Sequence, residues 1–377
     1  MQFDTQALVN GISEWMRCES PSNDPAALLR MAEIMQADAS ARGLTATLRM
    51  VSAGHGPELP LLHITNRAAG DTRRGLLVLG HLDTVHPIGM LQDNPIRIEG
   101  DRLYGPGGYD MKAGIYLVLT ALGAAVQAGS TPLPVDLLIV PDEEVGSQAS
   151  RAHIETMARN AKYCLVGEPA RANGGRCVTA RKGTGMLHLG VKGRAAHAGV
   201  AHDKGRSAIR EMAHQILALE AMTDYQRGVT VNVGTIQGGT TTNTVPGYCR
   251  CVVDFRLPDL QAADEMMQKM RALRPVGQDV ELDINVAINR PPMVKDAAAQ
   301  ALLEQVQDLA RGIGFTLEEA APTGGGSDAN FTSAMGVPSL DGLGADGDGA
   351  HTPQEHVLVS TLAMRATLWH AIITKLQ

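Results

Sequence analysis

Over the first 166 positions of the chain, hydrophobic residues follow one pattern, in which helical spacing alternates with short apolar runs. Apolar positions recur at helical spacing over residues 5–18 and 24–41, and short apolar runs then alternate with helical segments. The runs predict strands at 61–65, 76–79, 135–140 and 163–166, and the segments between them predict helices at about 110–128 and 148–160. Because such alternation favours a parallel sheet, we expect an α/β layer with a mixed, largely parallel sheet flanked by helices.

The pattern of hydrophobic positions changes near residue 182. Period-two alternation predicts strands at 186–191, 229–235, 248–255 and 280–286, with helices at 207–220 and 260–273. After residue 290 the α/β character returns, with helices at 297–311 and 357–376. We therefore predict one discontinuous domain formed by residues 1–182 and 290–377, and a smaller α+β domain of residues 183–289 inserted into it.

Composition narrows the class of protein. The chain of 377 residues has 44% hydrophobic residues and a net charge of −7, which indicates a globular protein and argues against a nucleic-acid partner. No stretch of about eighteen apolar residues is evident and the start lacks a secretory leader, so we expect no membrane partner. Five cysteines at irregular spacing indicate free thiols and a cytoplasmic location.

Several metal-capable side chains come directly after predicted strands. His81 and Asp83 follow the run at 76–79, Glu143 and Glu144 follow the run at 135–140, and Glu168 follows the run at 163–166. In sheets of this type, ligands gather beyond the carboxyl ends of the strands. Three separate segments are therefore expected to deliver side chains to the same edge of the sheet.

Two further residues complete the set. Asp110 follows a glycine-rich turn, and His351 lies in a loop rich in glycine and aspartate. Imidazoles and carboxylates together suit two zinc ions that share a bridging carboxylate, for which Asp110 is the natural choice. Each residue also has an ordinary explanation: Asp110 as a helix cap, the glutamates as solvated or turn residues, and the histidines as loop residues. Their joint occurrence favours the metal centre.

The adjacent glutamates suggest a division of roles. Neighbouring residues in an extended segment point in different directions, so one of Glu143 and Glu144 can bind metal while the other faces a water molecule. A carboxylate in that place can take the proton of the water and pass it to the leaving amine. Asp83, two residues after His81, can orient the imidazole through its second nitrogen.

These motifs resemble the zinc-dependent metallopeptidases that include bacterial glutamate carboxypeptidase, acetylornithine deacetylase, succinyl-diaminopimelate desuccinylase and aminoacylase. The resemblance covers nearly the whole chain. It implies two Zn²⁺ per subunit, with Co²⁺ or Mn²⁺ as substitutes. By resemblance, one zinc is held by His81, Asp110 and Glu168, and the other by Asp110, Glu144 and His351. Glu143 is then the general base and acid, Asp83 is the partner of His81, and the bond between Asp110 and Met111 is cis. Two departures, Ala113-Gly114 and Pro141-Asp142, remove no ligand.

The same resemblance implies roles for the inserted domain, which is expected to be ferredoxin-like and to form a homodimer. His197 would reach the active site of the partner subunit and stabilise the oxyanion. Asn243 and Arg256 would contact the substrate, and Arg256 would bind the carboxylate of the substrate.

Two more arginines and a loop bear on which substrate the protein recognises. Arg176 and Arg290 stand where glutamate carboxypeptidases carry basic residues, and arginine binds carboxylates in a bidentate fork. The loop around Gly325 offers backbone N–H groups to an anion, although it is equally explained as a connector in which Asp328 caps the next helix.

Three functions are consistent with this set. The first is a metallopeptidase that removes a C-terminal glutamate or aspartate from a peptide or an N-acyl conjugate. The second is an N-acyl amino acid deacylase, which the arginines disfavour where the substrate side chain is cationic. The third is a binding protein that keeps the fold, which should have lost a ligand or the base; this chain keeps every one of them.

Overall fold

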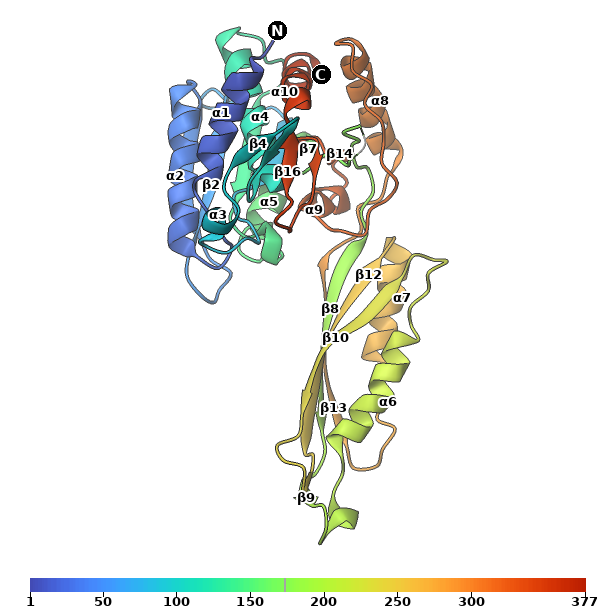
Figure 1. Cartoon of the computed structure of the whole chain (residues 1–377). Helices are drawn as coiled ribbons and strands as arrows, with labels where there is room; N and C mark the ends of the chain where they lie inside the picture. The colour runs from blue at the N-terminus through green and yellow to red at the C-terminus, as the bar shows by residue number, and fades with distance from the viewer. Residues whose placement is uncertain (173) are drawn as a thin grey trace. The chain divides into compact units, whose positions relative to one another are not determined.

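The computed structural model describes residues 1–172 and 174–377. The chain forms two compact units, which are drawn in Figure 1. The first unit comprises residues 1–180, 295–323 and 327–377, and the second unit comprises residues 181–294 and 324–326. The second unit is thus an insertion, and the short segment 324–326 returns to it from the later part of the chain.

A six-stranded sheet organises the first unit. Its order is β1 (Thr45–Val51), β2 (Leu59–Thr65), β6 (Val135–Val140), β3 (Gly75–His81), β7 (Ala161–Val166) and β14 (Ser339–Leu340). The pairs β1–β2 and β2–β6 are antiparallel, and the remaining pairs are parallel. The predicted mixed, largely parallel sheet is confirmed. All seven residues of β3 are buried, as expected for a central strand with both faces covered.

Helices cover this sheet. They are α1 (Thr5–Met16), α2 (Pro25–Ala41), α3 (Met90–Asp93), α4 (Ala113–Gln127), α5 (Arg151–Ala158), α8 (Ala297–Arg311), α9 (Ala329–Ala334) and α10 (Val359–Lys375). Local chemistry fixes where the first two begin, because Asp4 accepts the N–H of Ala7 and Asp24 accepts the N–H groups of Ala26 and Ala27. A small sheet of β15 (Gly347–Asp348), β16 (His356–Leu358), β5 (Arg102–Tyr104) and β4 (Arg97–Glu99) adjoins them.

Two details of the first unit differ from expectation. Strand β1 and the small sheet were not predicted, because their strands are short or mainly exposed and lack a clear apolar pattern. The helix expected from about Asp110 begins only at Ala113, and Asp110 has φ −116° and ψ 92°. Tyr109 and Asp110 instead donate their N–H groups to the side chain of Glu355, so this turn is held out of the helix.

One helical stretch, residues 108–127, is long and apolar enough to cross a membrane by length and composition. Such a stretch was not predicted from the sequence. Within its most apolar window, 72% is buried inside the first unit. It packs against β3 and α10 as a core helix.

The second unit is a β-α-β-β-α-β arrangement. Its antiparallel sheet has the order β10 (Thr230–Gly238), β12 (Tyr248–Leu257), β8 (Gly183–Lys192) and β13 (Glu281–Arg290). Helices α6 (Ala208–Glu220) and α7 (Leu260–Arg271) pack on one face of the sheet and form a core with it. Cys249 and Cys251 belong to this core, and burial raises the pKa of each thiol.

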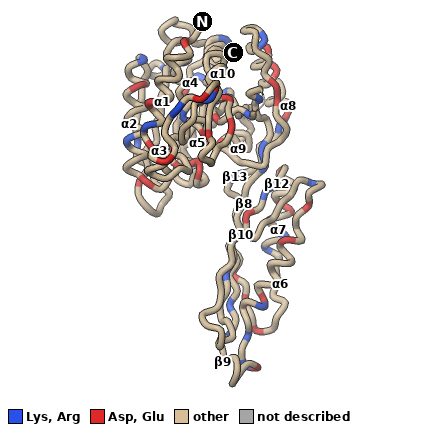
Figure 2. Tube along the Cα trace, in the orientation of Figure 1, with Lys and Arg blue, Asp and Glu red and all other residues tan. Residues whose placement is uncertain are grey.

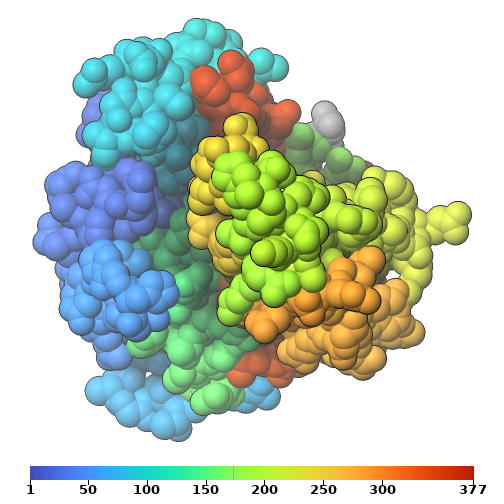
Figure 3. Space-filling model, turned by 90° about the horizontal axis from the view of Figure 1, so that it is seen from below, coloured from blue at the N-terminus to red at the C-terminus, as the bar shows by residue number. Residues whose placement is uncertain are grey.

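Two short strands form the tip of the second unit. Strand β9 (Ala196–His197) pairs with β11 (Thr244–Val245), so the segments around residues 197 and 243 lie side by side. The tip faces the viewer in Figure 3. Basic and acidic residues are interspersed along the described chain and form no continuous basic stripe there (Figure 2).

A close backbone approach gives a test of the first unit. A Cβ atom on Gly114 of α4 would lie 1.9 Å from the carbonyl oxygen of Gly167, which is backbone and cannot swing away. We expect Gly114→Ala to cost about 2–3 kcal/mol of unfolding free energy. Gly123→Ala, in the same helix, is the matched control. There the new methyl meets only the Arg42 side chain, so the change should stay below about 1 kcal/mol. Urea unfolding of both variants decides this, and equal midpoints would contradict it.

Candidate metal centre

The carboxylate of Asp110 lies between two imidazoles. Its Oδ1 is 3.2 Å from Nε2 of His81, and its Oδ2 is 3.3 Å from Nε2 of His351. These two histidines are 270 positions apart in the chain, yet each faces a different oxygen of the same side chain. That is the arrangement a carboxylate needs to serve two metal ions at once.

Each imidazole has a second carboxylate beside it. Nε2 of His81 is 3.6 Å from Oε1 of Glu168, and Nε2 of His351 is 3.2 Å from Oε2 of Glu144. Donor atoms of His81, Asp110 and Glu144 lie within 4.8 Å of one another, as do those of His81, Glu143 and Glu168. The structure thus gathers every expected ligand, together with the expected base Glu143, into one cluster in the first unit.

The order of the sheet explains this gathering. Strands β6, β3 and β7 are parallel neighbours. His81 is the last residue of β3, while Glu143 and Glu168 follow β6 and β7 within three residues. Their side chains therefore meet at the carboxyl edge of three adjacent strands, where α/β sheets bind ligands. His351 reaches the same place from the turn between β15 and β16, with a φ of 64°.

The electrostatics of the cluster call for positive charge. Burial raises the pKa of Glu144 to about 7, with Asp110 adding to the rise, and burial with the charges of Asp110 and Glu143 raises the pKa of Glu168 well above its usual range. Hydrogen bonding to Asp110 and Glu144 raises the pKa of His351 to about 10. Oε1 of Glu144 is buried without a hydrogen-bond partner in the described part of the chain. Crowded anionic oxygens with neighbouring imidazole nitrogens fit a pair of divalent cations of the zinc type.

Asp83 does more than the sequence suggested. Its main-chain oxygen is 2.9 Å from Nδ1 of His81, while its carboxylate is 3.5 Å away from that atom. Because a carbonyl only accepts, Nδ1 carries the proton and Nε2 offers its lone pair to the cluster. The carboxylate of Asp83 instead accepts the N–H groups of Glu143 and Glu144, at 3.2 Å each, and the hydroxyl of Ser22. It orients the two glutamates through their backbone. The bond between Asp110 and Met111 is cis, as the resemblance implied.

Two expected substrate-site residues lie together at the tip of the second unit. His197 pairs with Thr244 in the β9–β11 ladder, and the N–H of Ala198 donates to the carbonyl of Asn243 at 2.9 Å. Nδ1 of His197 accepts the N–H of Gly199, so a neutral ring carries its proton on Nε2 as a donor. Both residues are exposed.

The other expected residues of the second unit form a row. Arg256 of β12 and Arg290 of β13 both pair with Thr184 of the intervening strand β8. The guanidinium of Arg256 forms two 2.8 Å hydrogen bonds with Asp254. Gly325 lies nearby, because its carbonyl accepts from Arg181 at 3.1 Å, and a Cβ on the neighbouring Gly326 would touch Arg290.

Arg176 belongs to the first unit and stands opposite Arg171 in an antiparallel bridge. Arg171 was not predicted as a site residue. Nε of each arginine is buried and lacks a hydrogen-bond partner among the described residues. This segment is tied to the metal-centre loop, because the hydroxyl of Tyr109 donates to the carbonyl of Ala170 at 2.6 Å.

Two further residues near the cluster were not predicted from the sequence. His86 and Glu355 are buried and lie 2.5 Å apart, and Glu355 also binds the backbone beside Asp110. The available signal was their position, three residues after Asp83 and four residues after His351.

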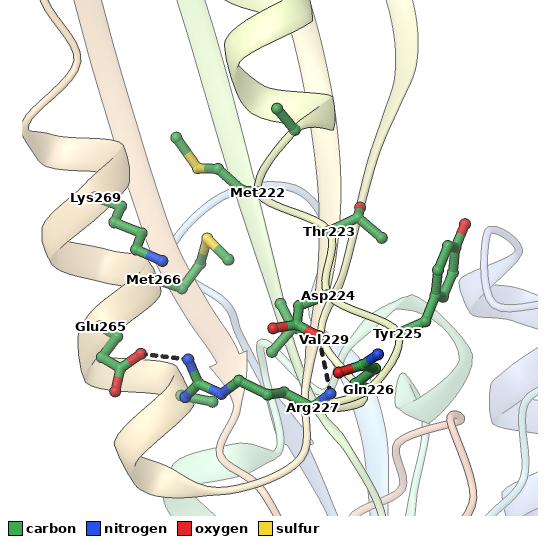
Figure 4. Close-up of a pocket in the computed structure, with 12 residues that line it drawn as sticks. Met222, Thr223, Asp224, Tyr225, Gln226, Arg227, Val229, Glu265, Met266 and Lys269 are labelled. Carbon is green, nitrogen blue, oxygen red and sulfur yellow. Dashed lines mark hydrogen bonds and ion pairs between the residues drawn. The ribbon is translucent and has the colours of Figure 1, made fainter.

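A cavity of about 530 Å³ lies within the second unit, between the 221–229 segment and α7 (Figure 4). Its most prominent charges already have partners. The guanidinium of Arg227 pairs with Glu265 at 2.8 Å, and the main-chain N–H of Arg227 donates to the carboxylate of Asp224 at 3.0 Å. The candidate site therefore rests on the cluster in the first unit.

Comparison with known proteins agrees with this geometry. Residues 77–375 match the family described as Peptidase family M20/M25/M40. The chain is 27% identical to carboxypeptidase G2 of Pseudomonas sp. (strain RS-16), covering 95% of this chain and 86% of that protein. It is 29% identical to acetylornithine deacetylase of Myxococcus xanthus, covering 87% of each. A tripeptidase structure from Staphylococcus aureus shares the fold, with a TM-score of 0.76, 21% identity and 99% coverage of both chains. The chain therefore belongs to the peptidase family M20/M25/M40 and is a metal-dependent hydrolase.

Proposed function

We propose that this hydrolase is a dinuclear zinc enzyme that removes a C-terminal glutamate or aspartate from a peptide or an N-acyl conjugate. The observation that carries the proposal is the carboxylate of Asp110, whose two oxygens face His81 and His351 separately. His81, Asp110 and Glu168 would hold one ion, and Asp110, Glu144 and His351 the other. Co²⁺ or Mn²⁺ could substitute at the same ligands.

Once bound, the ions supply Lewis-acid polarisation of the scissile carbonyl and acidify the attacking water. Residues of the chain transfer the proton and orient the metal ligands. Glu143, fixed through its backbone by Asp83, takes the proton of the water and returns it to the leaving nitrogen. Asp83 also keeps the lone pair of His81 directed at the cluster through its main-chain oxygen.

A homodimer forms part of this proposal. His197 stands on an exposed tip with Nε2 available as a donor, which suits an oxyanion in the site of a partner subunit. Strand β10 is an edge of its sheet, and Ile236 on it is 55% exposed while Leu217 on the adjacent α6 is 71% exposed. An apolar, unpaired edge beside an apolar helix face is suited to pairing with a second copy.

The arginines favour an acidic leaving group. Arg171 and Arg176 stand opposite each other in an antiparallel bridge, and Arg256 and Arg290 both pair with Thr184 in the second unit. Guanidinium groups recognise carboxylates and disfavour cationic side chains. The second candidate, an N-acyl amino acid deacylase, is favoured by the 29% identity to an acetylornithine deacetylase. We also propose a cytoplasmic location, which the five free thiols support.

The role of Glu143 is tested by Glu143→Gln, which keeps the size of the side chain but removes the base. We expect the variant to bind two metal ions and to lose about 10²–10⁴-fold in kcat. Metal content by elemental analysis and hydrolysis rates measure the two effects. Glu304→Gln, an exposed glutamate of α8, is the control and should match the wild type. Retained turnover in Glu143→Gln would remove the proton-transfer role.

The cross-subunit role of His197 is tested by mixing inactive variants. His197→Ala should lower kcat with unchanged metal content, while His202→Ala, on the same exposed tip, should not. If His197 acts in the partner's site, mixing Glu143→Gln with His197→Ala under subunit exchange restores about one quarter of wild-type activity. Half of the dimers are then mixed, and each mixed dimer has one complete site. No recovery, with exchange confirmed by mass spectrometry, would refute the shared site.

Substrate class is tested with N-acyl-glutamate, N-acyl-aspartate and N-acetylornithine in the presence of zinc. We expect cleavage of the acidic substrates. Arg176→Ala should raise KM for them about 10-fold or more, because it removes one charged hydrogen-bonding partner. Arg159→Ala, which removes an arginine at the end of α5, is the control. Cleavage of N-acetylornithine alone would favour the deacylase.

A further inference from the structure

The carboxylate of Glu355 is buried and collects four hydrogen-bond donors. The N–H groups of Tyr109 and Asp110 donate to its Oε1 at 2.9 and 3.0 Å. The N–H of Gly107 donates to its Oε2 at 2.9 Å, and Nε2 of His86 lies 2.5 Å from the same oxygen. Two carboxylate oxygens offer about four acceptor sites, so these four donors use the full acceptor capacity of the side chain. A group with its own N–H in that place would meet donors instead of acceptors.

These four bonds join the loops that carry the metal-centre residues. His86 belongs to the loop that follows His81 and Asp83, and residues 107–110 lead into Asp110. Glu355 itself stands four residues after His351. One buried side chain therefore ties together three loops, two of which hold the bridging carboxylate and the second histidine.

Hydrogen bonds hold the turn between His351 and Glu355. The N–H of Thr352 donates to the carbonyl of Gly349 at 3.0 Å, and the N–H of Glu355 donates to the carbonyl of Thr352 at 3.2 Å. The amide of Asn94 further holds the carbonyl of Pro353 at 2.9 Å. A short hydrogen-bonded segment thus connects Glu355 to His351. The imidazole of His351 is half exposed and contacts Asp110 and Glu144.

We propose that Glu355, assisted by His86, is a positioning residue that sets the separation between Asp110 and His351 and thereby controls occupancy of the second metal position. The inference rests on the proposed dinuclear function. It concerns the ion held by Asp110, Glu144 and His351 more than the ion held by His81, Asp110 and Glu168, because His81 is the last residue of β3 and Glu168 follows β7 by two residues. Residues that orient metal ligands in this way typically change metal affinity by about 10–100-fold when they are replaced.

The test uses full-length protein stripped of metal by chelation and titrated with Co²⁺, followed by visible absorption. Zinc content at buffered free Zn²⁺ gives a second measure. For Glu355→Gln, we expect the affinity for the second equivalent to fall about 10–100-fold and the first to change less. The exposed control Glu304→Gln should bind two equivalents as the wild type does. If Glu355→Gln keeps the wild-type affinity for both equivalents, or loses stability while the ratio of the two affinities stays unchanged, the proposal is wrong.

A second pair of variants covers the case in which Glu355→Gln does not fold. His86→Ala removes one donor from Oε2 of Glu355, and His86→Gln returns an N–H at a similar distance along the side chain. We expect weakened second-site binding in His86→Ala and its recovery in His86→Gln. Wild-type binding in His86→Ala would overturn the proposal. A wild type that takes up fewer than two equivalents, or is fully active without metal, would instead refute the dinuclear function on which the inference rests.

Discussion

Like-charge crowding around Asp110 is the constraint on which the candidate metal centre depends. Three carboxylates, those of Asp110, Glu144 and Glu168, are largely buried within a few ångströms of two imidazoles. Burial alone would drive the acids toward their neutral forms, as the raised pKa of Glu168 shows. Divalent cations reverse this preference because they stabilise the ionised ligands. The same crowding that disfavours the ionised carboxylates without metal favours the binding of doubly charged ions.

Holding such a cluster together requires rigid surroundings, and the structure supplies them through backbone contacts. The N–H of Gly344 donates to the carbonyl of Glu168 at 2.8 Å, and Gly114 of α4 approaches Gly167 too closely for any side chain. Arg365 of α10 is buried and donates to the carbonyls of Gly344 and Gly175. Burial lowers the pKa of this arginine to about 10, which still leaves it charged at neutral pH. A cation thus holds the carbonyl groups of the loop beside Glu168.

The two units have different architectures, suited to different tasks. The first places its ligands at the ends of buried parallel strands, where each strand end is fixed by neighbours on both sides. The second is an antiparallel sheet with helices on one face and an exposed tip that carries His197 and Asn243. Chemistry that needs fixed metal ligands suits the first arrangement. Recognition and subunit contact, which we propose for the second, suit exposed edges and loops.

The sequence by itself determined most of the local elements and predicted the candidate metal ligands. Apolar runs ending in His81, Glu143 and Glu168 marked strand ends, and the periodicity switch near residue 182 marked the insertion, because burial imposes a period of two or 3.6 on neighbouring positions. Only the tertiary structure decided which oxygen of Asp110 faces which histidine, that Asp83 acts mainly through backbone contacts, and that Glu355 joins three loops. These contacts join residues up to about 270 positions apart, and no local periodicity records them, because they arise only once the strands have been ordered in the sheet.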